Sequence, residues 1–149
     1  MTTLKPGDIA PAFSATDQFG NLVSSESLRG KKVALYFYPK DDTPGCTAEA
    51  CNLRDNYTEL INKGFVVIGV SPDAAKAHTK FTEKYSLPFP LLPDTEKEII
   101  KAYGVWGPKK FMGKSYEGVY RTTFVIDESG VIEKVIAQVD TKNHATQLF

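Results

Sequence analysis

The chain has 149 residues, enough for a single domain (1–149) that buries roughly two thirds of its unfolded surface without disulfides or metals. Eighteen basic residues balance eighteen acidic ones, and no dense lysine and arginine block occurs, so neither nucleic acid nor an anionic membrane is indicated as a partner. The N-terminus lacks the apolar core of a signal peptide and no apolar run could span a bilayer, which predicts a cytoplasmic protein.

The first half of the chain predicts a hairpin, a strand and a helix. Segments 12–15 and 22–24 flank a turn sequence and predict a small N-terminal β-hairpin. Residues 33–38 are nearly all apolar and rich in β-formers, which is typical of a central strand. From 46 to 61 apolar residues recur at helical spacing, and Gly64 supplies a stop.

The second half continues the alternation of strands and helices. Residues 65–71 predict another buried strand, and Pro72 and Asp73 begin a helix that includes Tyr85. A Pro-rich segment leads to a short helix over about 96–103, after which Trp106 opens a loop.

Near the C-terminus, a turn sequence separates two β-rich segments, 122–126 and 131–137. They predict antiparallel neighbouring strands. Strands that alternate with helices indicate an α/β fold.

The chain contains only two cysteines, Cys46 and Cys51, placed where the predicted central strand gives way to a helix. The first N–H groups of a helix are unpaired and carry the positive end of its dipole, so a thiol there loses its proton more readily than a free thiol. We therefore interpret Cys46 as a nucleophile and Cys51 as the thiol that closes a disulfide on it.

Three other interpretations of the cysteines remain open. A free cysteine is often only a small buried apolar residue. A permanent disulfide suits small secreted domains, whereas a reducing compartment favours a pair that cycles. A zinc site is poorly supported, because His78 and His144 lie far from both thiols in sequence.

The spacing P-x-x-x-T-x-x-C formed by Pro39, Thr43 and Cys46 resembles that of the peroxiredoxins, and so does Arg121, which directly precedes the sequence Thr-Thr-Phe-Val-Ile-Asp. Segments 36–51 and 103–107 are similar to the signature of one peroxiredoxin group, that of the bacterioferritin comigratory protein or peroxiredoxin Q. The likeness covers nearly the whole chain. It departs at the end, where only a short piece, 143–149, stands in place of the group's C-terminal helix.

The resemblance implies a thioredoxin-like fold, in which helices flank a central mixed β-sheet, and a thiol peroxidase activity toward hydrogen peroxide and organic hydroperoxides. It also implies recycling by thioredoxin or a glutaredoxin-like dithiol, and a monomer. No cofactor and no metal ion are implied.

Four further residues are candidates for the catalytic site beside the two cysteines. The Thr43 hydroxyl can face the sulfur and the peroxide, or can simply close a turn. The Arg121 guanidinium can stabilise a thiolate and orient the peroxide, although without the resemblance it would be read as a surface residue. Pro39 shields the thiolate in the resembling family, or only ends a strand. Glu49, one helical turn from Cys46, would oppose the thiolate if it faced the sulfur, and is expected instead to cap the helix or pair with an arginine.

A disulfide between the two cysteines is incompatible with a regular helix. Five residues give about 7.5 Å of rise and about 140° of rotation, which places the two Cα atoms roughly 8.7 Å apart. Disulfides rarely span more than about 6.8 Å between Cα atoms. We therefore expect the segment 43–53 to unwind when the disulfide forms.

Two other functions are compatible with a reactive cysteine pair. A thioredoxin-like disulfide oxidoreductase would normally use Cys-x-x-Cys, whereas this chain has four residues between its cysteines. A peroxide sensor without catalysis would use the oxidation of Cys46 only to change a surface.

Overall fold

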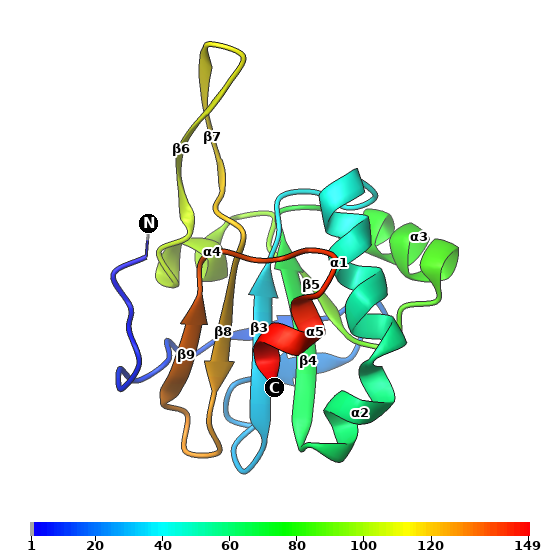
Figure 1. Ribbon diagram of the computed structural model, residues 1–149, viewed down its shortest axis with the longest axis vertical. Coiled ribbons are helices and arrows are strands. Elements are labelled where there is room, and N and C mark those ends of the chain that lie inside the picture. Colours follow the sequence, from blue (N-terminus) through cyan, green and yellow to red (C-terminus); the bar gives the residue numbers. More distant parts are fainter. Residues whose placement is uncertain (1) are drawn as a thin grey trace.

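A computed structural model describes residues 2–149 and shows a five-stranded mixed sheet (Figure 1). The strand order is β5-β4-β3-β8-β9, with β3 in the centre. Strands β3, β4 and β5 run parallel, while β8 is antiparallel to β3 and β9 is antiparallel to β8. Their bounds are β3 Lys32–Phe37, β4 Phe65–Ser71, β5 Leu91–Pro93, β8 Thr122–Ile126 and β9 Ile132–Ile136. The sheet confirms the predicted mixed, thioredoxin-like arrangement.

The apolar run in β3 supplies both faces of the sheet, because successive side chains of a strand point to opposite sides. Leu35 and Phe37 are buried in one core, while Ala34 and Tyr36 are buried in the other. A strand buried on both faces needs no polar alternation, which explains why this segment reads as continuously apolar.

Helices cover both faces. The core around Tyr36 contains side chains of α1 (Pro44–Asp55), α2 (Tyr57–Asn62), α3 (Ala75–Tyr85) and α5 (His144–Leu148). The core around Phe37 contains side chains of α4 (Glu98–Ala102) and of the N-terminal hairpin. Figure 1 shows α5 beside α1, in front of the sheet.

Two hairpins lie outside the main sheet. The predicted N-terminal hairpin is confirmed as β1 (Ser14–Thr16) paired with β2 (Leu22–Ser24). The prediction of a loop after Trp106 is wrong, because Trp106–Phe111 and Lys114–Val119 pair as strands β6 and β7. Figure 1 shows this hairpin projecting from the body of the protein. Left-handed backbone at Met112 and Gly113 closes this hairpin.

Several predicted boundaries move by a few residues. The helix expected over 46–61 begins at Pro44 and is interrupted at Asn56, so that it forms α1 and α2. The helix expected from Pro72 begins at Ala75. Within residues 2–149, no helix is both long and apolar enough to cross a membrane.

Candidate active site

Cys46 lies in the first turn of α1, at the end of the loop that leaves the central strand. Thr43 is the N-cap residue and Pro44 occupies the first helical position, where a missing N–H costs no hydrogen bond. Cys46 is thus the third helical residue and lies in the first turn, close to the predicted helix start. Cys46 is only 1% exposed, although reaction with a peroxide needs an accessible sulfur. A peroxide reaches this sulfur only when the groups that cover it move.

Arg121 joins Cys46 to Glu49. Its Nη2 donates to the Cys46 sulfur at 3.3 Å and its Nη1 donates to Oε1 of Glu49 at 2.8 Å. A Cβ atom at Gly45 would lie 3.1 Å from Nη2, so the glycine leaves room for this approach. Arg121 directly precedes β8, and β8 pairs with β3. The sheet therefore fixes the position of Arg121. The sequence without the resemblance predicts that Arg121 lies on the surface. The structure differs, because the Arg121 side chain is only 23% exposed.

Glu49 is completely buried and forms the expected pair with an arginine. Burial raises the pKa of Glu49 to about 7, although the adjacent Arg121 opposes the shift. A carboxyl group with this pKa exists in both protonation states near neutral pH.

Thr43 and Pro39 lie in the loop, but among the residues that the structure describes neither of them hydrogen-bonds to the sulfur. The Thr43 hydroxyl donates to the Lys40 carbonyl oxygen at 2.8 Å. In this conformation the hydroxyl therefore closes a turn and does not face the sulfur. Rotation about its side-chain bond is needed before this hydroxyl can face a peroxide. Pro39 is half-buried just beyond β3.

Cys51 is half-buried on α1 and is a free thiol, as is Cys46. Burial raises the pKa of the Cys51 thiol, with Asp55 adding to the effect and Arg54 opposing it. Cys51 is therefore protonated at neutral pH, which suits a thiol that waits for its partner to be oxidised.

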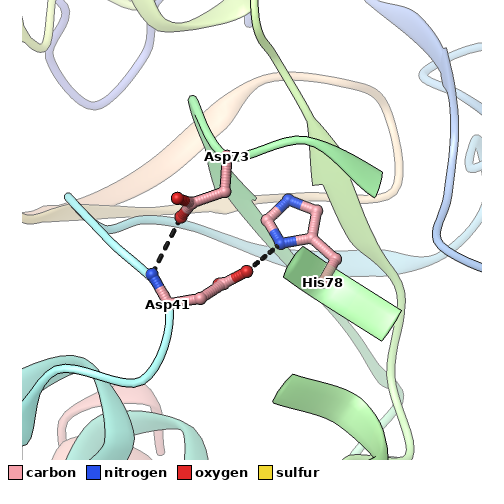
Figure 2. A group of neighbouring side chains, drawn as sticks. All are labelled: Asp41, Asp73 and His78. Atoms are coloured by element: carbon pink, nitrogen blue, oxygen red, sulfur yellow. Dashed lines mark hydrogen bonds and ion pairs between the residues drawn. The ribbon is translucent and has the colours of Figure 1, made fainter. Parts of the chain in front are cut away.

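A hydrogen-bonded cluster anchors the loop before Cys46 (Figure 2). Asp41 accepts from the Tyr38 hydroxyl at 2.6 Å, and its other oxygen lies 2.6 Å from Nδ1 of His78. The Asp41 backbone N–H donates to Asp73 at 2.8 Å. The ligand atoms of Asp41, Asp73 and His78 lie within 4.8 Å of one another, close enough to surround a metal ion. Hydrogen bonds already engage both Asp41 oxygens and one Asp73 oxygen, whereas Nε2 of His78 is buried without a partner among residues 2–149.

His144 is the residue at this site that the sequence did not reveal. It begins α5, is fully buried, and places Nε2 at 3.5 Å from Oε2 of Glu49. Residues 49 and 144 are far apart in the chain, and no motif joins them. The available signal was the short piece 143–149, within which the structure shows α5.

Comparison with known proteins supports the same family. The AhpC/TSA family model matches residues 6–135. Peroxiredoxin Bcp of Escherichia coli K12 is 48% identical over 144 residues, which cover 97% of this chain and 92% of that protein.

Solved structures resemble the whole fold. BcpB of Mycobacterium tuberculosis is 34% identical, with a TM-score of 0.84 over 97% of this chain and 93% of that one. A bacterioferritin comigratory protein of Xanthomonas campestris is 27% identical, with a TM-score of 0.86 over 99% of this chain and 94% of that one; it was solved as trapped intermediate and ligand complexes that concern its alkyl peroxide reduction. The chain belongs to the AhpC/TSA family, in the Bcp or peroxiredoxin Q group of thiol-dependent peroxidases.

Proposed function

We propose that this domain reduces hydrogen peroxide and organic hydroperoxides with Cys46 as the nucleophile. The observation that carries the proposal is the Arg121 guanidinium, which donates to the Cys46 sulfur while the sheet holds it in place. A fixed cation beside a thiol favours the thiolate, and the thiolate is the nucleophilic form. The alkyl peroxide reduction described for the Xanthomonas protein supports the choice of substrate.

The thiolate attacks one peroxide oxygen, and the other oxygen leaves as water or an alcohol. Cys46 becomes a sulfenic acid, which can condense with the Cys51 thiol to form a disulfide and water. Thr43 and Pro39 flank the sulfur in this proposal, the first as a hydrogen-bonding group for the peroxide and the second as a shield against water. The two cysteines lie on one helix, α1, so its first turns must unwind for the bond to close.

The disulfide is then reduced by an external dithiol, thioredoxin or a glutaredoxin-like protein. A cycling pair of this kind fits a reducing compartment such as the cytoplasm. The cycle needs only one chain, because both thiols lie on α1, and a monomer is therefore sufficient. The two thiols and the external dithiol account for each redox step, so the proposed cycle needs no cofactor or metal ion.

The test is peroxide consumption in the presence of thioredoxin, thioredoxin reductase and NADPH. We expect sustained turnover that Cys46→Ser abolishes, and that Cys51→Ser stops after one equivalent of peroxide. Insulin reduction without peroxide turnover would instead identify a disulfide oxidoreductase. A single stoichiometric burst of the wild-type protein under full reductant supply would identify a sensor.

A further inference from the structure

Glu49 has one oxygen engaged and one oxygen free, although both are buried. Oε1 accepts from Arg121 at 2.8 Å. Oε2 has no hydrogen-bond partner among the residues that the structure describes, and it lies 3.5 Å from Nε2 of His144. A buried carboxylate oxygen without a donor is unfavourable, so this atom needs an explanation.

The hydrogen bonds of His144 determine which of its nitrogens carries a hydrogen. Nδ1 lies 2.7 Å from Oε1 of Gln147, and the same oxygen accepts from the Asp140 N–H at 2.9 Å. The Gln147 amide nitrogen donates to the Gln138 carbonyl, which fixes the amide orientation. Nδ1 must therefore be the donor, and in a neutral ring Nε2 is the acceptor. Burial lowers the pKa of His144, which keeps the ring neutral at neutral pH.

Two acceptor atoms, Oε2 of Glu49 and Nε2 of His144, thus face each other inside the protein. The Thr123 hydroxyl lies 2.7 Å from the same nitrogen and donates to its single lone pair in the neutral ring, so Nε2 offers Oε2 neither a hydrogen nor a free lone pair. An ionised carboxylate is therefore unfavourable at Oε2, whereas a proton on Oε2 removes its charge.

The charges at the site also favour a proton on Glu49. Within residues 2–149, Arg121 is the one permanent cation that bonds to either acid, and it donates to both Cys46 and Glu49. Two anions opposite one buried cation would leave a net negative charge without a partner, whereas one anion leaves the site neutral. If Cys46 is the thiolate, Glu49 is the group that should be protonated.

We propose that Glu49, beside His144, is a proton store for the peroxidase site: Glu49 carries a proton on Oε2 while Cys46 is a thiolate, and releases it when peroxide is reduced. This inference rests on the proposed peroxidase function. Glu49 holds the proton, and His144 is a positioning residue whose acceptor nitrogen, 3.5 Å from Oε2, disfavours the carboxylate form.

The step balances in atoms and charge. The thiolate sulfur attacks one peroxide oxygen, the S–O bond forms as the O–O bond breaks, and the departing alkoxide or hydroxide gains the proton that Glu49 gives up. The products are the Cys46 sulfenic acid, an alcohol or water, and a Glu49 carboxylate paired with Arg121. Sulfur loses two electrons and the peroxide gains them. When the disulfide is later reduced and Cys46 returns as a thiolate, Glu49 takes a proton back from solvent.

Other titratable groups around the pair do not replace it. Tyr36 on β3 has a pKa raised well above its usual value, chiefly by burial, and stays protonated. Burial lowers the pKa of Lys109 on β6, with Arg121 adding to the effect, and its ammonium group donates to the Val119 carbonyl. Asp140 affects His144 from outside the pair and raises its pKa slightly against the effect of burial.

The test uses infrared difference spectroscopy on full-length Cys51→Ser, in which the reaction stops at the sulfenic acid. We expect the carbonyl band of a protonated carboxylic acid to disappear when peroxide is added, and the band to be missing from Cys51→Ser/Glu49→Gln. The exposed Glu59 of α2 provides the control, because Glu59→Gln should leave the band and its loss unchanged. A carboxylate band that is the same before and after oxidation would overturn the proposal.

Rates give a second readout in the same variants. The amide that Glu49→Gln introduces can still accept from Arg121 but holds no acidic proton, so we expect sulfenic acid formation to slow by about a hundredfold, at the lower end of the effects of proton transfer groups. Alkylation of Cys46 by iodoacetamide consumes no proton and should change by less than about twofold, because Arg121 still favours the thiolate. Equal peroxide rates with and without Glu49, or an equal loss of both reactions, would contradict the proposal.

Labelling the histidines with ¹⁵N tests the role of His144 without a substitution in the core. The Nε2 resonance of His144 should move when the sulfenic acid forms, while that of His78, which faces Asp41, serves as the internal control. A stationary His144 resonance would show that the charge of the neighbouring Glu49 does not change, which would contradict the proposal. If dimedone labelling shows that no sulfenic acid forms at all, the peroxidase proposal fails rather than the proton store.

Discussion

Arg121 acts on two side chains at once, and its geometry matters as much as its charge. The two terminal nitrogens of one planar group reach the Cys46 sulfur at 3.3 Å and Glu49 at 2.8 Å. A lysine ammonium is a single point on a flexible stem and cannot keep both contacts. One lost hydrogen bond to a charged group costs about 1.5–3 kcal/mol.

Arg121→Lys should therefore slow the alkylation of Cys46 at neutral pH by about tenfold or more, since about 1.4 kcal/mol corresponds to a factor of ten. The measurement is the rate of iodoacetamide alkylation against pH in the Cys51→Ser background. Arg29→Lys, an exposed site far from the sulfur in the fold, is the control and should leave the rate unchanged. An unaltered profile for Arg121→Lys would show that the bidentate contact is unimportant.

Glu49 also makes the stability of the reduced protein depend on pH. Its pKa is about 7 in the folded protein against 4.5 in the unfolded chain, so the folded state keeps a proton that the unfolded state has lost. Stability should fall as the pH rises from about 4.5 to about 7 and then level off, by an amount on the order of 3 kcal/mol. Glu49→Gln removes this dependence. Chemical unfolding of both proteins at several pH values checks it. Parallel curves for the two proteins would refute the assignment.

At the scale of elements, α1 joins the reactive loop to the C-terminus. Asn52 of α1 donates to the Lys142 carbonyl and accepts from the Ala145 N–H, each at 2.8 Å. His144, next to Ala145, faces Glu49 from the start of α5. If the first turns of α1 unwind, the contacts that hold α5 against it are lost as well.

Hydrogen exchange should therefore show two regions losing protection on oxidation. We expect faster amide exchange in the disulfide form across residues 43–53, and also across α5, while α3 on the same face stays protected. The comparison is between the reduced protein and protein oxidised with one equivalent of hydrogen peroxide. Equal protection of 43–53 in the two states would mean that the helix does not unwind.

Across the whole molecule, the elements that depend on short sequence patterns could be predicted, and the contacts that depend on packing could not. The apolar run of β3, the helix start at Pro44 and the turn between β8 and β9 are local signals, and they placed Cys46 near a helix start and Arg121 beside a strand. The role of Arg121 at the sulfur came only from the resemblance. The β6–β7 hairpin was missed, because its lysines and glycines give no buried-strand pattern and its strands pair only with each other. The contact between Glu49 and His144 was missed for a different reason: it depends on how α5 packs against α1, which no local pattern encodes.

The central claim is that Cys46 takes an oxygen from peroxide and that Cys51 of the same chain resolves it. The most direct test is the intact mass of the protein after one equivalent of hydrogen peroxide, compared with Cys51→Ser and Cys46→Ser. We predict that the wild-type protein loses two hydrogens and keeps the mass of a monomer, that Cys51→Ser gains one oxygen, and that Cys46→Ser is unchanged. A wild-type protein that gains oxygen without closing a disulfide, or that appears as a cross-linked dimer, would contradict this account.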